Sequence, residues 1–290
     1  MVPPRDRGGS GGGRPPRGNT DAVLARELAV EAGRRLLALR ARGGEPDLLR
    51  KAGDRLSHEF LSAELAARRP GDVVVSEEGA AGPARLSASR VWIVDPLDGT
   101  REFGEPGRTD WAVHVALWER GAPGQLAAGA VALPAQGQVL STLDPPPPGR
   151  GGTETVMTGT LPPRSGPPAE RGAPSARVRI VVSRTRAPRL VQDISDLIGA
   201  ELVPLGSAGA KAAAVLTGEA DAYVHAGGFY EWDTAAPVAV ARAAGFHASR
   251  IDGSPLAYNQ ADLKMPDILV CRPVLAGALL QAIREVTNAR

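Results

Sequence analysis

The sequence predicts a layered α+β or α/β protein, in which helices cover β-sheets. Between residues 20 and 143, two stretches of helical apolar spacing are followed by several short strand-forming runs. Between residues 177 and 290, single strands and helices alternate, which is typical of an α/β layer. Of the 290 residues, 43% are hydrophobic, so the chain can bury a substantial core.

The first half begins with two predicted amphipathic helices. In the first helix, apolar residues recur at helical spacing after Thr20 and Asp21, and the "RGG" at residues 42–44 ends the pattern. The second helix runs through residues 56–65 and ends at Pro70-Gly71. Short apolar runs then predict strands at residues 73–75, 91–94, 112–117, 128–133 and 138–142.

The second half alternates more regularly between strand and helix. Its apolar runs predict strands at residues 178–182, 202–205, 221–224 and 267–271. The predicted helices between and after these strands begin near Pro188, Gly209, Thr234 and Pro273.

Two segments have the composition of flexible chain. Residues 1–18 are rich in Gly, Pro and Arg and are expected to form a disordered tail. Residues 144–176 are rich in Pro and Gly and are expected to form a surface insertion. They flank a predicted N-terminal α+β subdomain at residues 19–143, and the insertion separates it from a C-terminal α/β subdomain at residues 177–290.

The distribution of charge argues against a nucleic-acid partner. Residues 1–18 carry a net charge of +3, whereas the remainder has 30 basic and 31 acidic residues. A nucleic-acid-binding face needs clustered positive charge, which the nearly neutral remainder does not offer. No apolar run reaches the roughly 18 residues of a membrane span, and no signal peptide is evident. We therefore expect no membrane partner and a cytoplasmic location, and the sequence leaves open whether the chain forms a homodimer.

The stretch "VWIVDPLDGTREF" places two acids, Asp95 and Asp98, at the end of a predicted buried strand. Carboxylates held this close repel each other unless a cation lies between them, and Mg²⁺ prefers oxygen ligands. Gly99 and Thr100 follow and can open a turn or helix whose backbone N–H groups attract phosphate. The pattern therefore predicts a divalent cation site, with a solvated acidic turn as the alternative.

Two further motifs accompany this stretch: "SEEG" at residues 76–79 and "EWDTAAP" at residues 231–237. Together with "DPLDGT", they resemble the lithium-sensitive, Mg²⁺-dependent phosphatases of the inositol monophosphatase superfamily. The resemblance extends over roughly residues 20–285. It implies an α-β-α-β-α layered sandwich of the sugar phosphatase and inositol monophosphatase type, and hydrolysis of a phosphate monoester.

The resemblance also implies roles for individual residues. Two or three Mg²⁺ ions would be held by the carboxylates of Glu77, Asp95, Asp98 and Asp233 and by the backbone carbonyl of Leu97. Asp54 and Thr100 would orient the attacking water. The four histidines show no ligand spacing; His58, His114 and His247 are expected to be structural or surface residues, and His225 is an expected substrate contact.

Within the superfamily, "DGTREF" and "EWDTAA" are close to the bacterial 3′-phosphoadenosine 5′-phosphate phosphatases of sulfate assimilation. Ala226 stands near the position of a glutamate that binds inositol in inositol phosphatases, which weakens the inositol alternative. Lys211 has the spacing of a substrate-pocket lysine in the nucleotide branch, although an exposed lysine on an alanine-rich helix is the alternative. The expected substrate contacts are Gly99, Thr100, Ser183, Arg184, Ser207, Lys211 and His225.

The sequence thus predicts a Mg²⁺-dependent phosphatase whose partner is a small phosphorylated nucleotide. The expected reaction removes the 3′-phosphate of 3′-phosphoadenosine 5′-phosphate, with its 5′-phosphosulfate as a further candidate substrate. An inositol-1-monophosphatase or a fructose-1,6-bisphosphatase is one alternative, because these enzymes share the metal ligands. A non-catalytic RNA- or partner-binding protein that uses the Arg-rich tail is another.

Overall fold

The structure, a computed structural model, describes residues 17–79, 82–147, 177–185 and 187–289. Its first half forms the helices and strands expected from the apolar pattern, and three short 3₁₀ turns. These elements are α1 (Arg17–Ala41), α2 (Pro46–Arg68), β1 (Val73–Ser76), η1 (Pro83–Leu86), β2 (Arg90–Asp98), α3 (Thr100–Gly104), β3 (Ala112–Glu119), η2 (Pro123–Gln125), β4 (Leu126–Leu133), η3 (Pro134–Gln136) and β5 (Gln138–Ser141).

Strands β1 to β5 form one sheet in sequence order. Strands β1 and β2 run parallel, and each later neighbour is antiparallel. The parallel register pairs Ser76 with Val94, so the residues that follow, Glu77 and Asp95, come to the same end of two neighbouring strands. This register places motifs separated by 18 residues at one edge of the sheet.

The second half forms a second sheet with its own helices. Its elements are β6 (Arg179–Ser183), α4 (Arg189–Ile198), β7 (Glu201–Leu205), α5 (Ala208–Leu216), β8 (Ala222–Tyr230), α6 (Glu231–Ala243), β9 (His247–Ser249), β10 (Lys264–Cys271) and α7 (Pro273–Asn288). The strand order is β7-β6-β8-β10-β9, with β7, β6 and β8 parallel and the last two pairings antiparallel.

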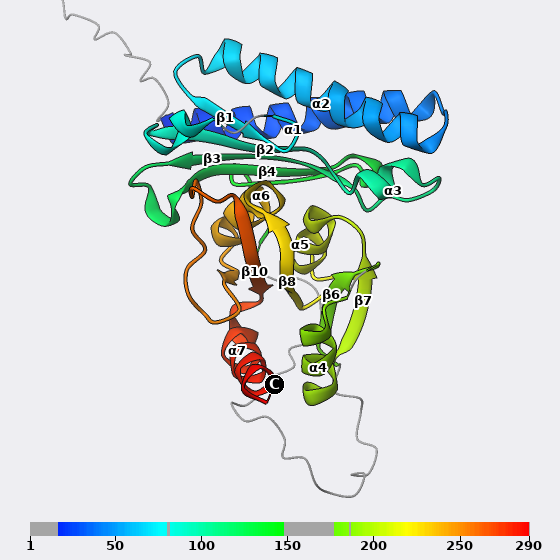
Figure 1. The fold of residues 1–290 in the computed structure, drawn as a ribbon, viewed down its shortest axis with the longest axis vertical. Coiled ribbons are helices and arrows are strands. Elements are labelled where there is room, and N and C mark those ends of the chain that lie inside the picture. The colour runs from blue at the N-terminus through cyan, green and yellow to red at the C-terminus, as the bar shows by residue number, and fades with distance from the viewer. Residues whose placement is uncertain (1–16, 80–81, 148–176, 186, 290) are drawn as a thin grey trace, which may run out of the picture.

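The elements stack in five layers (Figure 1). Helices α1 and α2 cover one face of the first sheet, and α5 and α6 fill the space between the two sheets. Helices α4 and α7 cover the remaining face of the second sheet. The apolar residues of α1 that recur at helical spacing, Leu24, Leu28, Ala32 and Leu36, are at most 2% exposed, because they pack on this first sheet. The predicted α-β-α-β-α sandwich is thereby confirmed.

Several boundaries differ from the predictions. Helix α1 begins at Arg17, so residues 17 and 18 of the predicted tail are helical, and residues 1–16 lie outside the described residues. Asp21 therefore lies inside this helix, and its carboxylate pairs with Arg69 and Arg90 at 2.7 and 2.8 Å. The short strand β9 was not predicted.

The predicted insertion at residues 144–176 lies outside the described residues from residue 148 onward. The division into subdomains at residues 19–143 and 177–290 stays a prediction, although each sheet draws its strands from one of these ranges. Among the described helices, none combines the length and the apolar character needed to cross a bilayer.

Candidate active site

Three carboxylates meet between the first sheet and the middle helical layer. Asp95 and Asp98 lie on β2, and Asp233 lies in the first turn of α6; one oxygen from each falls within 4.8 Å of the others. Asp95 and Asp98 are buried. Helix α6 begins at Glu231, three residues before the predicted start, because the Asp233 carboxylate accepts the Tyr230 N–H at 2.7 Å and caps the helix.

Glu77 follows β1 beside this trio, and its side chain keeps solvent access. Surrounding protein and repulsion from Asp233 and Asp98 raise the pKa of its carboxyl group to about 7. The neighbouring Glu78 is also exposed. The acids of the "SEEG" motif therefore lie at the rim of the cluster, and Glu77 shares its electrostatic field.

The electrostatics of the cluster fit a bound cation. Burial, and then repulsion from Asp98, raise the pKa of Asp233 to about 7. Burial and repulsion from Asp98 and Glu77 raise the pKa of Asp95 well above its usual value. Because clustered carboxylates favour a positive charge among them, and because oxygen donors suit hard cations, these residues fit a divalent ion such as Mg²⁺.

Asp98 is the exception, because protein donors surround its carboxylate. Its oxygens accept hydrogen bonds from the Ser207 hydroxyl at 2.6 Å, the Ala208 N–H at 3.2 Å and the Gly209 N–H at 2.6 Å. These donors form the first turn of α5, which Ser207 caps. Burial alone would raise the pKa of Asp98, but the adjacent His114, with help from Lys211 and Ser207, lowers this pKa to about 2. The protein itself therefore stabilises the charged form of Asp98.

His114 is fully buried on β3, and its two ring nitrogens face two acceptors. Nδ1 lies 3.1 Å from the Trp232 carbonyl, and Nε2 lies 3.2 Å from Asp98 Oδ2. A carbonyl can only accept, so Nδ1 carries a proton, and Nε2 forms an ion pair with Asp98 when the ring is protonated. Burial opposes this charge, but Asp98 raises the pKa of His114. His114 thus acts on Asp98 directly, a contact that was not predicted from the sequence.

Asp54 and Thr100 lie together at the end of β2. The Thr100 hydroxyl is 3.2 Å from Asp54 Oδ1 and 3.0 Å from the Leu97 carbonyl oxygen. Burial, and then repulsion from Glu78, raise the pKa of Asp54 to about 6, although the Thr100 hydrogen bond opposes this shift. Strand β2 continues to Asp98 rather than ending at Asp95, with an irregular register between them. Pro96 lies in this irregular stretch and has no N–H for the ladder.

Gly99 allows the chain to turn sharply into α3. Its φ is +83°, and an added Cβ would lie 2.9 Å from Ser207 Cβ and 3.2 Å from the Asp110 carbonyl oxygen. Neither the backbone conformation nor the space accommodates a side chain without strain. The close approach of β2 to the start of α5 therefore requires glycine at this position.

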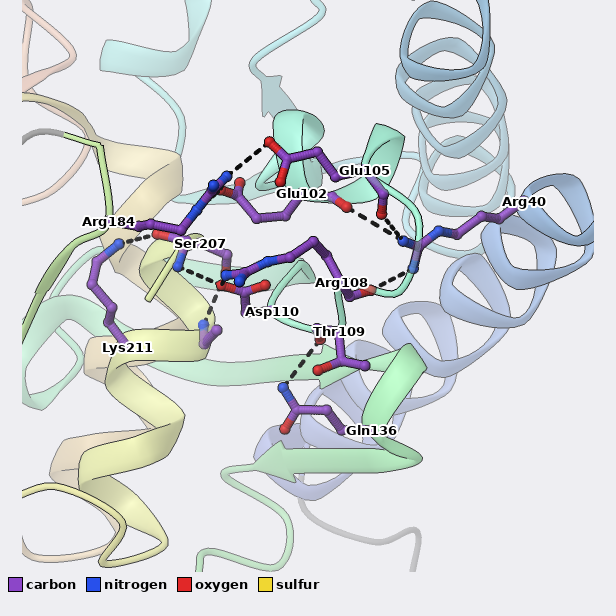
Figure 2. Close-up of polar contacts among 12 residues, drawn as sticks. Arg40, Glu102, Glu105, Arg108, Thr109, Asp110, Gln136, Arg184, Ser207 and Lys211 are labelled. Atoms are coloured by element: carbon purple, nitrogen blue, oxygen red, sulfur yellow. Dashed lines mark hydrogen bonds and ion pairs between the residues drawn. The ribbon is translucent and has the colours of Figure 1, made fainter. Parts of the chain in front are cut away.

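Two arginines from other segments of the chain hold the five-residue helix α3 and the loop that follows it in place (Figure 2). Arg40, near the end of α1, donates to the carbonyl oxygens of Arg108 and Glu105 at 2.7 and 2.5 Å. Arg184, after β6, pairs with the carboxylates of Glu102 and Glu105 at 2.7 and 2.9 Å. The Glu102–Arg184 pair therefore joins the first half of the chain to the second.

A cavity of about 320 Å³ opens beside the acidic cluster. Its lining includes most of the expected substrate contacts, namely Gly99, Ser183, Ser207, Lys211 and His225, together with Asp98 and Asp233. A neighbouring cavity of about 220 Å³ is lined by Thr100, Arg101 and Arg184, and both cavities share Gly99 and Ser183. A larger cavity of about 580 Å³ lies between α1 and α2, but its lining contains none of the clustered acids.

Lys211 is not a surface lysine. Its side chain is buried, and its ammonium donates to the Gly206 carbonyl and lies 5.4 Å from the centre of the Tyr223 ring. Burial lowers the pKa of Lys211, and the nearby carboxylates of Asp98 and Glu102 oppose this shift. The alternative of an exposed lysine on an alanine-rich helix is therefore wrong.

The comparison with protein families decides the classification. The model of the inositol monophosphatase family matches residues 22–288. The chain belongs to the inositol monophosphatase family. This membership confirms the resemblance inferred from "SEEG", "DPLDGT" and "EWDTAAP", and with it the expectation of a phosphatase.

Relatives within the inositol monophosphatase family carry more specific names. A 3′-phosphoadenosine 5′-phosphate phosphatase of Mycobacterium leprae is 48% identical over 275 residues, which cover 92% of this chain and 94% of the relative. A protein of the same name from Mycobacterium bovis is 50% identical over 259 residues, which cover 88% and 90%. The 3′(2′),5′-bisphosphate nucleotidase CysQ of Escherichia coli K12 is 30% identical over 210 residues, which cover 72% and 78%.

Solved structures of the family support the fold. Inositol monophosphatase II from Staphylococcus aureus has a TM-score of 0.70 and 21% identity, and the match covers 90% of this chain and 94% of that one. SuhB of Mycobacterium tuberculosis has a TM-score of 0.65 and 23% identity, and covers 93% and 98%. At these identities the likeness shows the shared fold.

The inositol monophosphatase family is metal-dependent, which agrees with the trio Asp95, Asp98 and Asp233. The structure brings most of the expected site residues to this trio or its cavities. Arg184 also lines a cavity, but it is paired with two carboxylates. His114 was missed at the sequence level, where its signal was a single ionisable residue inside the apolar run "WAVHVALW".

Proposed function

We propose that this chain is a Mg²⁺-dependent phosphatase that removes the 3′-phosphate of 3′-phosphoadenosine 5′-phosphate. The observation that carries the proposal is the carboxylate trio of Asp95, Asp98 and Asp233, which lies beside a cavity whose wall contains the cation Lys211. The relatives with 48% and 50% identity bear this activity in their names, and they match nearly the whole chain. A phosphatase that accepts the 5′-phosphosulfate as well is compatible with the same cavity.

Glu77, Asp95, Asp98 and Asp233, together with the Leu97 carbonyl, are the proposed ligands of two or three Mg²⁺ ions. When bound, such ions lower the pKa of water and offset the charge of the phosphoryl oxygens. The raised pKa values of Glu77 and Asp233 support this assignment, because a cation would relieve the repulsion that raises them.

Asp54 and Thr100 are proposed to orient the attacking water. The Asp54 carboxylate accepts a hydrogen bond from the Thr100 hydroxyl. The oxygen lone pairs of Thr100 are then free to accept a hydrogen bond from water. The water oxygen forms a bond to phosphorus, and the bond from phosphorus to the 3′-oxygen breaks. The products are inorganic phosphate and the nucleoside 5′-phosphate, whose new 3′-hydroxyl takes up a proton.

The remaining proposed contacts hold the nucleotide. Gly99 and Thr100 follow Asp98 directly in the sequence, and the Ser207 hydroxyl donates to the Asp98 carboxylate, so these three residues are assigned to the reacting phosphate. Lys211 is assigned to a phosphate of the nucleotide. Ser183 and His225 are assigned to the nucleoside part; the His225 ring lies 4.0 Å, centre to centre, from the Phe229 ring. Arg184 is assigned to substrate binding in the neighbouring cavity, where Glu102 and Glu105 hold its side chain.

The test measures phosphate release by purified protein with Mg²⁺ on three substrates: 3′-phosphoadenosine 5′-phosphate, inositol 1-phosphate and fructose 1,6-bisphosphate. We expect kcat/KM for the nucleotide to be at least about tenfold higher than for the other two, because a polar site rejects substrates that leave its groups unpaired. An equal or higher kcat/KM on inositol phosphate would overturn the nucleotide assignment. An absence of Mg²⁺-dependent release on all three substrates would overturn the phosphatase assignment.

A further inference from the structure

A second polar network lies outside the acidic cluster and is almost completely buried. Its side chains belong to Arg85 on η1, Glu231 at the start of α6 and Asn259 in the segment before β10, which are 4%, 1% and 7% exposed. Burying charged side chains costs free energy unless they are well hydrogen-bonded. The contacts of this network therefore indicate what it holds together.

Arg85 and Asn259 bind each other reciprocally. Arg85 Nη1 donates to Asn259 Oδ1 at 3.0 Å, and Asn259 Nδ2 donates to the Arg85 carbonyl oxygen at 2.9 Å. Arg85 Nη2 also donates to the Ala261 carbonyl oxygen at 3.0 Å. Asn259 adopts a φ of +58°, which is uncommon for a residue other than glycine. These bonds hold residues 259–261 against η1 in one conformation.

Glu231 fixes the same segment to α6. Its two carboxylate oxygens accept the Asn259 and Gln260 N–H groups, each at 2.7 Å. The Glu231 N–H donates to the Leu263 carbonyl oxygen at 2.8 Å. The first turn of α6 is thus tied to both ends of a short stretch of backbone, and this turn also contains Asp233.

The network therefore connects two parts of the molecule that each carry an acid of the cluster. Arg85 lies on η1, which packs against β1, the strand that Glu77 directly follows, and Glu231 precedes Asp233 by two residues. Glu77 belongs to the layer of the first sheet, and Asp233 belongs to the middle helical layer. Within the described part of the chain, the side chains of Arg85 and Asn259 donate to each other's residues and to Ala261, and not to a carboxylate of the cluster.

We propose that Arg85, Asn259 and Glu231 are positioning residues that hold Glu77 and Asp233 at the separation a divalent cation requires. This inference rests on the cation site of the proposed function. Residues that orient metal ligands from outside the coordination shell typically change metal affinity by about 10- to 100-fold when they are replaced.

The test uses Arg85→Met and Asn259→Gly in the full chain. Glycine accepts the positive φ of residue 259, so the second variant removes the side-chain bonds without adding backbone strain. Isothermal titration with MgCl₂ in the absence of substrate gives the Kd of the tightest Mg²⁺ site. The rise in Tm caused by Mg²⁺ gives a second, independent measure of Mg²⁺ binding.

We expect both variants to bind Mg²⁺ about 10- to 100-fold more weakly than the wild type. The control is Arg250→Met, which removes a partly buried arginine that pairs with Asp267 at 2.6 Å. The carboxylate that Arg250 contacts lies on β10 rather than in the acidic cluster. The loss of the Arg250 side chain should therefore lower the Tm without changing the Kd for Mg²⁺.

The outcomes separate the two proposals. A wild-type protein that binds no Mg²⁺ overturns the cation site itself. If the wild type binds Mg²⁺ and the two variants bind it equally well, the positioning role is wrong. A lower Tm with an unchanged Kd, as in the Arg250 control, overturns the positioning role as well, because it assigns the network to folding alone.

Discussion

At the scale of single residues, one hydroxyl proton is shared between two acceptors. Thr100 can donate to Asp54 or to the Leu97 carbonyl, but it has one proton. We expect Asp54→Asn to lower kcat on 3′-phosphoadenosine 5′-phosphate by about 100-fold or more, within the range of proton-transfer catalysis, with KM nearly unchanged. Steady-state kinetics at saturating Mg²⁺ provide the measurement.

The control for this variant is Glu59→Gln, on the same helix, where an exposed carboxylate pairs with Arg55. It should keep wild-type kinetics, since exposed pairs contribute little. A normal kcat with a raised KM in Asp54→Asn would contradict the water-orienting role and assign Asp54 to substrate binding.

Lys211 provides a second residue-scale test, which concerns the substrate. A buried ammonium that meets a nucleotide phosphate makes a charge-assisted contact of about 1.5–3 kcal/mol, so Lys211→Ala should lower kcat/KM on the nucleotide by about 10- to 100-fold. Residual turnover of inositol 1-phosphate should fall much less, because that substrate has no second phosphate. Lys264→Ala, which removes an exposed lysine, should leave both values unchanged. An equal loss on both substrates would make Lys211 a packing residue.

At the scale of elements, the start of α5 packs so closely on β3 that it leaves no room for a side chain at Gly209. An added Cβ would lie 2.2 Å from His114 Nε2 and 2.9 Å from Ala112 Cβ. We expect Gly209→Ala to destabilise the protein by about 1–3 kcal/mol through overpacking. We also expect it to weaken activity, because the Gly209 N–H binds Asp98. Urea unfolding and kinetics measure the two effects.

The matched control is Gly277→Ala on α7, where an added Cβ meets nothing within 4 Å. Alanine should stabilise this helix by about 0.5–1 kcal/mol relative to glycine. If Gly209→Ala were also neutral or stabilising, the close contact between α5 and β3 would be wrong.

The elements that the sequence predicted well are those with local signals. The apolar spacing of α1 and the alternation of the second half depend on neighbours along the chain, and they located most helices and strands. The contact between His114 and Asp98 depends on the β2–β3 register, on the start of α5 and on the absence of a side chain at Gly209. No single sequence motif indicates all three conditions. The link from Arg85 through Asn259 to Glu231 also depends on segments far apart in the sequence, so no motif predicts it.

The acids of the cluster differ in how far the sequence alone predicts them. Asp95 and Asp98 were recognisable because two acids follow a buried strand, and their convergence needs only one turn of chain. Asp233 was assigned only through the family resemblance, since nothing local brings it to residues more than a hundred positions earlier. The pairing of Arg184 with Glu102 was missed because arginines and glutamates are common in this sequence, and no local pattern singles out this pair.

At the scale of the whole molecule, the cluster makes stability depend on pH and on cations. The folded-state pKa values of Asp54, Glu77 and Asp233 are about 6, 7 and 7, above their ordinary values of 3.8, 4.5 and 3.8. Between the ordinary and the raised pKa of each group, the folded state binds more protons than the unfolded state. The stabilisation that comes from this proton binding therefore falls as pH rises, and it is fully lost above about pH 7.

We expect the Tm in excess chelator to fall between pH 5 and pH 8, and Mg²⁺ to raise the Tm more at pH 8 than at pH 5. Asp233→Asn should flatten the fall in chelator, because it removes one of the titrating groups. Differential scanning calorimetry measures these Tm values. A Tm in chelator that rises with pH equally in both proteins, or no effect of Mg²⁺ at pH 8, would contradict the prediction.

The order of the proposed ligands along the chain has a consequence during synthesis. Asp98 and Asp233 are neighbours in the folded protein but are separated by 135 positions in the sequence. At translation rates of about 5–20 residues per second, the ribosome adds Asp233 roughly 7 to 27 seconds after Asp98. Until then, the carboxylates of the first sheet lack their partner from α6. A nascent or prematurely terminated chain that stops before α6 should therefore hydrolyse no phosphate ester in the cell.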